Sequence, residues 1–549
     1  MGVREQVELI PGTEVVFAGT DGESAASQQL VLIPQPTNNP DDPLNWSSKW
    51  KTIIIFNQFV FVFVSILTPL SIAPLTQIFT AEFQKTIPQV NLLFGVAAIV
   101  LGYANFLIVP LANVYGRRPI IILCGLVCIL ANIWQALVTS FPSFLGARVI
   151  SGLGAAANES IMPMVVSDLL FVHQRGRSMA LYFWAYFLGI FIGPIIAGSI
   201  AARVNWRWFF WVCAILQGAS LVFLIVAHPE TKYSRPSSHN VGPGPAALRR
   251  RGNTEEDAAD EKVGGGDDDA VSRSSGNKHQ AGVTSNTILS AVDERPVGGP
   301  SREQFSLIPK PRFSHGMSSV VRDVLSPLQI FSFPIVLWAA LSMGFAANCL
   351  LALNLTESQV FAAPPYLFGA AQVGYTNFAF FVGAVIALVT AGPLSDWIAL
   401  RKARRNGGVL EAEFRLLSVL PYVVACLVGM VVTAVGYQRG WHWQITVVVG
   451  YGLVGVQVVG IPAVVISYAV DSYKSLPGEI MIAATVVKNS FGFAMVFFFN
   501  DWSERQGYIA PVLTLMAITV GLSLLGLAVF IPRGKTFRMA TKNSNLHLL

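Results

Sequence analysis

The sequence predicts an all-α polytopic membrane protein with 12 transmembrane helices in two sets of six. Composition is the first reason, because 53% of the 549 residues are hydrophobic and 12% are charged, whereas charged residues make up about 25% of soluble domains. The second reason is a series of apolar runs, each close to the ~20 residues that a helix needs to cross a bilayer. The third is a long polar interruption between the sixth and seventh runs. A soluble fold is excluded, because it could not bury so much apolar surface.

The first half of the chain begins with residues 1–50, a polar and Pro-rich stretch that we expect to be a disordered cytoplasmic tail. An N-terminal six-helix bundle follows at 51–228, with spans at 52–76, 88–112, 120–138, 144–166, 178–200 and 206–226. Residues 229–325 hold glycine, serine and acidic runs with too little apolar content to offset the entropy of folding. We therefore expect a disordered cytoplasmic linker, with an amphipathic stretch at 318–325 lying along the inner membrane surface.

The second half contains a C-terminal six-helix bundle at 326–532 and a cytoplasmic tail at 533–549. Its spans are expected at 333–355, 373–397, 416–436, 445–470, 480–499 and 509–531. An even number of spans puts both termini on one side of the membrane. Arginine and lysine are concentrated in the loops on that side, so the termini are predicted to be cytoplasmic. The same bias explains the net charge of +6, and no basic patch indicates a nucleic-acid partner.

Apart from Arg207 and Asp396 at span ends, three charged residues lie inside predicted spans: Arg148 and Glu159 in the fourth and Lys488 in the eleventh. A charge at bilayer depth costs at least ~2.5–3.5 kcal/mol, so such residues usually face a cavity or a protein interior. Arg148 and Glu159 are eleven positions apart, about three helical turns, and would project from one face of an unbroken helix. A buried lysine is paired or neutral, so we expect Lys488 to have a polar partner in the other bundle, on the second or eighth span.

Cysteine and histidine give no sign of a cofactor, a metal or an enzyme active site. The five cysteines all fall in apolar runs without metal-ligand spacing, and the seven histidines are scattered. No nucleophile and base recur together. We therefore predict that the protein binds no cofactor and is not an enzyme.

Several motifs resemble those of the major facilitator superfamily. Residues 148–156 resemble its fourth-helix Arg motif, and the fifth span resembles its antiporter motif at Gly189, Gly193, Pro194 and Gly198. The turn after the second span resembles its cytoplasmic signature at Asn113, Gly116, Arg117 and Arg118, although the usual Asp is Asn113 here. Runs at 40–46, 159–176, 403–408 and 468–489 are similar to fungal twelve-span drug:proton antiporters, and the resemblance covers nearly all of 40–535.

The resemblance implies two pseudo-symmetric bundles that rock about a site at the membrane midplane. It implies a cytoplasmic gate to which Asp168, Arg175 and Asp396 also contribute, Asp396 together with the basic cluster at 401–405. Spans one, four, seven and ten usually line the cavity in this superfamily. The predicted cavity residues on these spans are amides and aromatic residues: Asn57, Gln58, Asn158, Asn348, Asn354, Gln457, Phe61 and Phe345. Lys488 on span eleven is added to them.

Proton coupling requires a carboxylate that binds and releases a proton as the cavity changes sides. Glu159, in the middle of its span, is the predicted coupling acid, and Arg148 is expected to modulate that proton or to contact an anionic substrate. The alternatives for Glu159 are a permanent ion pair, a packing role or direct contact with substrate. Asn45, Asn158 and Asn354 lie in glycosylation sequons. Asn45 is expected to be cytoplasmic, Asn158 to lie within the membrane and Asn354 to lie on the outer side against the membrane, so we expect all three to be unmodified.

The predicted function is proton-coupled export of a small organic compound, a xenobiotic or a secondary metabolite, by a monomer in the plasma membrane, with the vacuolar membrane as the alternative. Protons, the substrate and the lipid bilayer are the expected partners. Proton-coupled uptake of an organic cation such as a polyamine is the nearest alternative. A non-transporting nutrient sensor is a further one, and a hexose facilitator fits less well because span seven lacks a Gln-Gln pair.

Overall fold

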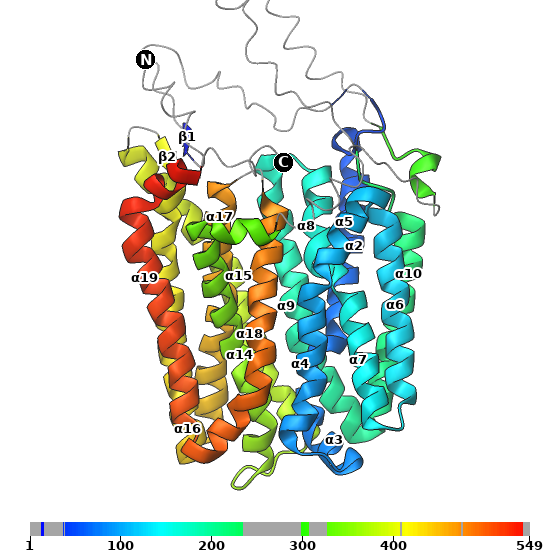
Figure 1. The fold of residues 1–549 in the computed structure, drawn as a ribbon, viewed down its shortest axis with the longest axis vertical. Coiled ribbons are helices and arrows are strands. Elements are labelled where there is room, and N and C mark those ends of the chain that lie inside the picture. The colour runs from blue at the N-terminus through cyan, green and yellow to red at the C-terminus, as the bar shows by residue number, and fades with distance from the viewer. Residues whose placement is uncertain are drawn as a thin grey trace, which may run out of the picture.

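The computed structural model describes residues 13–15, 37, 39–233, 298–306, 327–406, 409–473 and 476–541. Within these residues it contains 12 helices that are long and apolar enough to cross a membrane, which confirms the predicted number of spans. Figure 1 shows them standing side by side in two groups, α2 to α10 and α14 to α19. The two sets of six predicted from the apolar runs are therefore the two bundles of the fold.

The N-terminal bundle contains six spans, two of which are divided. They are α2 (Ser48–Leu70), α4 (Ile87–Tyr103) with α5 (Asn105–Tyr115), α6 (Arg117–Leu137), α7 (Phe141–Ala155) with α8 (Ala157–Leu169), α9 (Val172–Arg203) and α10 (Trp206–Ala227). A short turn, η2 (Ala73–Leu75), and a short helix, α3 (Thr76–Phe83), connect the first span to the second.

The division of the fourth span bears on the site. At the break the backbone N–H of Glu159 donates to the carbonyl of Ala156 at 3.1 Å, a three-residue step in place of the four-residue step of an α-helix. Pro163, one turn later, has no N–H to offer the carbonyl of Glu159. The regular spacing that would put Arg148 and Glu159 on one face is therefore interrupted.

The C-terminal bundle has the same number of spans. They are α14 (Pro334–Ala362), α15 (Ala370–Arg405), η5 (Ala412–Val419) with α16 (Leu420–Arg439), η6 (Ile445–Tyr451) with α17 (Gly452–Ser472), α18 (Pro477–Gln506) and α19 (Ile509–Thr541). η6 is a π-helical segment. Most of these helices extend several residues beyond the predicted spans, and α14 in particular continues seven residues past 355.

One face of the protein carries β1 (Thr13–Val15), β2 (Val409–Glu411) and the end of α19; we call it the terminal face, and the opposite face, which carries α3, the distal face (Figure 1). β1 and β2 pair in antiparallel register. Arg538, fully buried, donates to both carboxylate oxygens of Glu413 at 2.9 and 2.7 Å and to the hydroxyl of Thr13 at 3.1 Å. Residues 533–541, predicted to be tail, are therefore helical and anchored, and part of the predicted N-terminal tail is bound to the C-terminal bundle.

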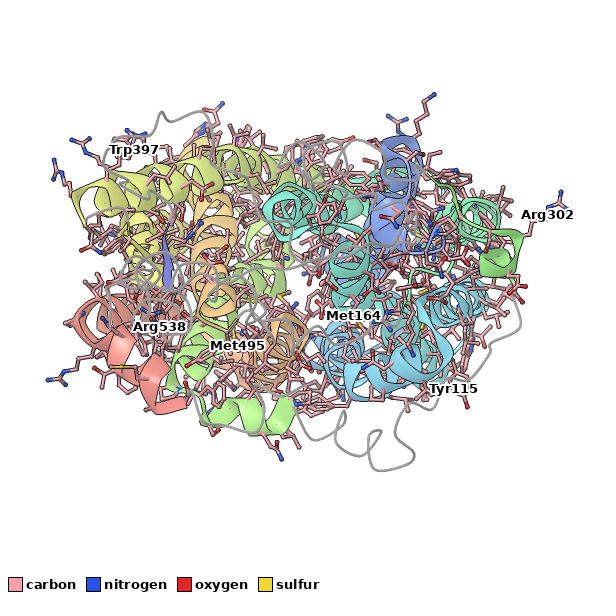
Figure 2. The ribbon with its side chains drawn as sticks, turned by 90° about the horizontal axis from the view of Figure 1, so that it is seen from above. Tyr115, Met164, Arg302, Trp397, Met495 and Arg538 are labelled. Carbon is pink, nitrogen blue, oxygen red and sulfur yellow. The ribbon has the colours of Figure 1, made fainter. Side chains whose placement is uncertain are left out.

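The prediction of disorder is also wrong for two segments on the N-terminal bundle, 39–47 and 298–306. The first contains η1 (Pro43–Asn45), where the Asp42 carboxylate accepts from the backbone N–H of Leu44 at 3.1 Å. The second contains η3 (Arg302–Phe305), whose Gln304 side chain donates to the carbonyl of Asp41 at 2.9 Å. Seen from the terminal face, Arg302 and Arg538 lie on opposite bundles (Figure 2). The rest of the predicted linker, 234–297 and 307–326, lies outside the described residues, as does the amphipathic stretch.

The two bundles meet at backbone distance in their distal halves, along a contact between α9 and α15 that we call the distal seam. Gly374 on α15 faces the carbonyl of Pro194, and Gly198 on α9 faces the carbonyl of Ala370. A Cβ at either glycine would overlap the opposite carbonyl. These two positions need glycine so that helices from different bundles can approach this closely.

Candidate functional site

A cavity of about 90 Å³ lies between the bundles. Seven helices line it, α2, α4, α8 and α9 from the N-terminal bundle and α14, α17 and α18 from the C-terminal one. Most lining side chains are apolar or aromatic, and the polar ones are few. The volume holds several water molecules but is below the ~300–1,000 Å³ typical of sites for drug-sized ligands. This conformation is therefore contracted around its cavity.

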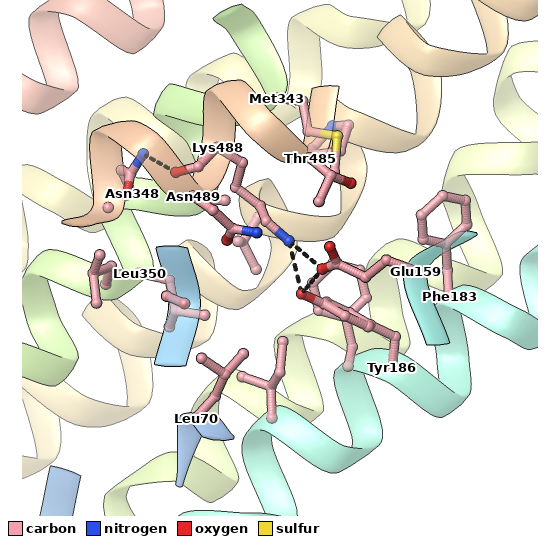
Figure 3. A pocket seen from close by; sticks show the side chains of 18 of the residues that line it. Leu70, Glu159, Phe183, Tyr186, Met343, Asn348, Leu350, Thr485, Lys488 and Asn489 are labelled. Atoms are coloured by element: carbon pink, nitrogen blue, oxygen red, sulfur yellow. Dashed lines mark hydrogen bonds and ion pairs between the residues drawn. The ribbon is translucent and has the colours of Figure 1, made fainter. Parts of the chain in front are cut away.

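An ion pair joins the two bundles in this cavity. Lys488 Nζ on α18 lies 2.6 Å from Glu159 Oε1 on α8 and donates to the hydroxyl of Tyr186 on α9 at 2.8 Å. The Tyr186 hydroxyl in turn donates to the same Glu159 oxygen at 2.8 Å. Figure 3 shows the three side chains converging from separate helices. Lys488 thus has a partner in the opposite bundle, as predicted, but the partner is Glu159 on the fourth span and not a group on span two or eight.

The ion pair is almost completely removed from solvent, with side-chain exposures of 3% for Glu159 and 11% for Lys488. Two buried charges compensate each other only while they stay in contact. Glu159 Oε2 is buried and has no hydrogen-bond partner among the described residues. One oxygen of the carboxylate is therefore held by the lysine and the tyrosine, and the other is available to a proton.

Three amides line the cavity beside the ion pair. Asn348 Nδ2 donates to the carbonyls of Gly344 at 2.8 Å and of Lys488 at 3.3 Å, which fixes its orientation. Within the described part of the chain, Asn354 Oδ1 and Asn489 Nδ2 are buried without a hydrogen-bond partner. An unused acceptor and an unused donor in an apolar cavity are groups that can orient a ligand. Asn354 is 6% exposed and lies in the cavity, and its lack of glycosylation stays a prediction.

The other predicted cavity amides serve contacts within one bundle. Asn57 Nδ2 donates to the carbonyl of Phe223 at 2.9 Å, Asn158 Nδ2 to the hydroxyl of Ser65 at 3.1 Å, and Gln457 Nε2 to the carbonyl of Ala346 at 3.1 Å. These side chains, like the buried Gln58, Phe61 and half-buried Phe345, do not line the central cavity. An amide facing a neighbouring helix and one facing a cavity leave the same pattern in the sequence, and here most face a helix.

Arg148 does not take part in the site. Its guanidinium is fully buried and donates to the carbonyls of Leu93 at 2.7 Å, Thr68 at 2.9 Å and Pro69 at 2.5 Å, and to the Gln135 side chain at 3.2 Å. Thr68 and Pro69 end α2, where the last carbonyls have no partner within the helix. Arg148 lies outside the cavity lining in this conformation, so its predicted role of modulating the proton on Glu159 or contacting substrate has no contact here to support it and stays a prediction.

The antiporter-like motif on α9 divides its contacts between the bundles. Gly189 and Gly193 pack against α2 in the same bundle, near Ile66 and Ser71. Pro194 and Gly198 form the distal seam with α15. The motif therefore packs α9 against its own bundle at one end and against the opposite bundle at the other.

The predicted gate residues of the first half lie together on the terminal face. Arg117 Nε lies 3.0 Å from Asp168, and the carbonyl of Asn113 accepts from Lys232. Gly116, with φ +102°, lets the chain turn into α6. Arg118 donates to the carbonyls of Ile225 and His228. The side chain of Arg175 lies outside the described residues. Asp168, which was predicted to belong to the same gate as Arg175, binds Arg117.

Glu230 is a member of this group that the sequence interpretation did not identify. Its carboxylate accepts from the backbone N–H groups of Arg117 at 2.9 Å and Arg118 at 3.1 Å, at the first turn of α6. A carboxylate is stabilised at a helix N-terminus by the free N–H groups and the helix dipole. The signal in the sequence is an acid three residues after the end of the sixth span, close to the Arg117-Arg118 turn only in the folded chain.

The second half has its own charge cluster, with a different cation from the predicted one. Asp396 lies 2.6 Å from Arg415, and the same guanidinium lies 2.8 Å from Asp471. The predicted contact of Asp396 with the basic cluster at 401–405 stays a prediction; α15 continues through that cluster, where Arg401 lies over the ring of Trp397 and Lys402 over that of Phe414. Asp471, whose side chain is 38% exposed, shares Arg415 with Asp396.

A second buried acid was missed because the end of span seven was placed too early. α14 continues to Ala362, and Glu357 is fully buried inside the C-terminal bundle. Asn377 Nδ2 on α15 donates to its two oxygens at 3.4 and 3.3 Å. The sequence interpretation assigned Glu357 to a loop, since Thr356, Glu357 and Ser358 have the composition of one.

The five cysteines are all free and buried. No group of three or more His, Cys, Asp or Glu side chains that could hold a metal lies in the described ranges. The polar groups that line the central cavity include one ion pair and a small set of amides.

Comparisons with known proteins agree with this architecture. Residues 54–496 match the family profile of the Major Facilitator Superfamily. Protein HOL1 of Saccharomyces cerevisiae is 26% identical, over 98% of this chain and 97% of its own length. An uncharacterised MFS-type transporter of Schizosaccharomyces pombe is 28% identical, over 91% of this chain and 88% of its own. The probable efflux pump mfs2 of Aspergillus flavus is 24% identical, over 86% of this chain and 99% of its own. Among solved structures, the human organic anion transporter MFSD10 (TETRAN) matches with a TM-score of 0.53 and 15% identity, over 89% of this chain and 99% of its own.

Proposed function

Because the chain belongs to the Major Facilitator Superfamily, and is thus a multi-pass membrane transporter of a small molecule, we propose that it exports an organic compound in exchange for protons. The observation that carries this proposal is the buried ion pair of Glu159 and Lys488, at 2.6 Å across the two bundles. A titratable carboxylate in that position ties its protonation state to the relative position of the bundles. An acid that gains and loses a proton at this position can couple proton binding to alternating access of a site between the bundles.

The coupling step begins at Glu159 Oε2, the oxygen without a hydrogen-bond partner among the described residues. A proton bound there removes the negative charge that holds Lys488, so the attraction between the bundles weakens and the cavity can open. Loss of the proton restores the carboxylate and the ion pair. Tyr186 donates to Glu159 and accepts from Lys488, so it keeps the two groups aligned through the change.

The cavity lining favours an amphipathic organic molecule, such as a drug or a secondary metabolite. Tyr182, Phe183 and Phe187 supply aromatic surface, and Asn354 and Asn489 supply one unused acceptor and one unused donor. Aromatic faces and a few placed polar groups suit moderately apolar compounds of varied structure. The Aspergillus flavus relative is named an efflux pump, which supports export as the direction.

Uptake of an organic cation such as a polyamine is less well supported. Glu159 is the only carboxylate among the cavity residues that the structure describes, and Lys488 already neutralises it. A polycation entering this cavity would meet a lysine and no free acid. Our proposal further includes cytoplasmic termini, action as a monomer and residence in the plasma membrane; a complete cavity within one chain supports the monomer.

Accumulation of labelled organic compounds in cells with and without the protein tests this proposal. The compounds are a panel of amphipathic drugs and secondary metabolites together with spermidine, and each is measured with and without a proton uncoupler. The variant is Glu159→Gln, and the matched control is Glu82→Gln, at an ion pair with Arg207 that is 2.8 Å long, partly exposed and on the distal side of the N-terminal bundle. Membrane level is measured for every variant.

We expect the protein to lower the accumulation of at least one compound, and the uncoupler and Glu159→Gln to abolish that effect while Glu82→Gln retains it. Raised accumulation would replace export by uptake. Proton-dependent export that survives in Glu159→Gln would show that the coupling acid lies elsewhere. No change for any compound, with the protein in the membrane, would favour the sensor.

A further inference from the structure

Glu357 is a buried acid that the transport site does not use. Its side chain has no measurable exposure, and it is not among the residues that line the central cavity. Within the described residues it has no ion pair, and its one hydrogen-bond donor is Asn377 Nδ2, at 3.4 and 3.3 Å. An isolated ionised carboxylate in a low-dielectric interior is strongly unfavourable. Two long bonds from one amide do not compensate the charge, so the geometry favours the protonated form of this carboxyl.

The described groups that bond to or interact electrostatically with Glu357 come from three elements, and none of them carries a positive charge. α15 contributes Asn377, α16 contributes Tyr437 and η6 contributes Tyr451, and both phenols interact electrostatically with the carboxyl. The two tyrosine hydroxyls bond to each other. Tyr508, against the ring of Tyr437 at 5.4 Å, is the next titratable group. A change of charge at Glu357 is therefore felt by a hydrogen-bonded pair of tyrosines.

A row of packed aromatic rings connects Glu357 to the central ion pair. It starts at Tyr186, the partner of Glu159, and continues through rings whose centroids are 5.6, 6.1, 5.9 and 4.1 Å apart, those of Phe187, Phe191, Phe380 and Tyr451. Phe191 is on α9 and Phe380 is on α15, so the row crosses from one bundle to the other. The contact between these two rings can persist only while the bundles are together at this level.

The distal seam lies beside this crossing. Asn377 is three residues after Gly374, which meets Pro194 at the seam. Phe380 is fully buried between Phe191 and Tyr451. Parting of the seam would uncover Phe380 and bring water toward Tyr451 and Glu357. Hydration lowers the cost of the carboxylate charge, whereas closure restores it.

We propose that Glu357 is a second proton-binding site, which takes up a proton as the distal seam closes and returns it to the distal side as the seam opens. The inference rests on the proposed alternating access. A proton that enters and leaves on the same side is not transported; its effect is to make closure of the seam depend on the pH of the distal compartment. Acid on that side favours the closed seam, and alkali favours the open one.

The seam distance can be measured without substrate or transport. A donor and an acceptor dye are attached through Ala202→Cys and Leu367→Cys, both at exposed positions near the distal ends of α9 and α15. The native cysteines are buried and do not compete for label. Single-molecule energy transfer is recorded across pH in the otherwise unchanged protein, in Glu357→Gln and in Asn377→Leu, with Glu82→Gln as control.

We expect the distance to increase through one pH midpoint in the unchanged protein and in Glu82→Gln. Glu357→Gln, which resembles the protonated side chain, should keep the short distance at every pH. Asn377→Leu removes the donor that favours the charged carboxylate, so its midpoint should move upward. A distance that is independent of pH, or an unshifted midpoint in both the Glu357→Gln and Asn377→Leu proteins, would overturn the proposal. A failure of proton-coupled export is read separately, from the effect of Glu159→Gln on accumulation.

Discussion

The buried ion pair of Glu159 and Lys488 predicts a specific pattern of stability in single and double variants. Lys488→Met leaves a carboxylate, and Glu159→Gln leaves an ammonium group, in a site where the two side chains are 3% and 11% exposed. Removing one partner of a buried pair costs about 3–5 kcal/mol, because the remaining charge is uncompensated. The double variant removes both charges and should lie close to the unchanged protein.

The buried cysteines provide the assay. A maleimide dye that fluoresces on reacting with a thiol reports unfolding, since all five cysteines are free and buried in the folded protein. At fixed temperature, destabilising the folded state by about 3 kcal/mol relative to the unfolding transition state raises the rate of unfolding, and hence of dye reaction, roughly 10²-fold. We expect this acceleration in each single variant and less than about tenfold in the double variant.

The control is the pair of Glu82 and Arg207, which is 34% and 30% exposed and 2.8 Å long. A pair of that kind contributes about 0–1 kcal/mol, so Glu82→Gln should change the rate less than about fivefold. The reasoning would be refuted if the single variants at Glu159 and Lys488 behaved like Glu82→Gln, or if the double variant were as labile as the worse single one.

Three other measurements test the fold. Gly374→Val forces a side chain against the carbonyl of Pro194 at the distal seam; overpacking of this kind costs about 1–3 kcal/mol, and transport should fall about tenfold or more at unchanged membrane level. Arg538→Met leaves the buried Glu413 unpaired, so dye reaction should accelerate about as much as in Lys488→Met, and adding Glu413→Leu should reverse most of the effect. Burial, with a smaller contribution from a neighbouring positive charge, lowers the pKa of His228 to about 3. Because the imidazole of the unfolded chain binds a proton below about pH 6.5 and that of the folded protein does not, the free energy of unfolding is highest above that pH and falls by on the order of 2 kcal/mol at pH 5. His228→Gln should reduce this loss.

The spans could be predicted from the sequence because membrane insertion depends on local composition. Helix ends could not, since a helix can continue past the apolar run wherever neighbouring helices cover its polar residues. α14 is the instructive case: Glu357 has the sequence context of a loop residue but the environment of a core residue. Only the positions of α15, α16 and η6 distinguish the two.

The site was partly predictable, and the limits follow from how charges are satisfied. A buried lysine needs an acid, and Glu159 was the one acid in the middle of a span, so the pair with Lys488 could have been inferred from charge alone, although 329 positions separate the two. Arg148 shows the opposite situation. Three of its four partners are backbone carbonyls, which every residue carries, so no sequence pattern distinguishes an arginine that binds backbone from one that faces a cavity.

The packing of segments 39–47 and 298–306 onto the N-terminal bundle changes which part of the chain limits the bundles' separation. Ser47 donates to the carbonyl of Gly298 at 3.0 Å, and Glu230 to the carbonyl of Gln304 at 2.8 Å. Residues 234–297 therefore begin and end on the same bundle, and their length does not affect the reach between the two halves. Two stretches run from one half to the other, 307–326 and also 16–36, which joins β1 on the C-terminal bundle to segment 39–47 on the N-terminal one. A change in the length of 234–297 thus leaves the connections between the bundles unaltered, whereas a change in the length of 307–326 or 16–36 alters the chain that joins one bundle to the other.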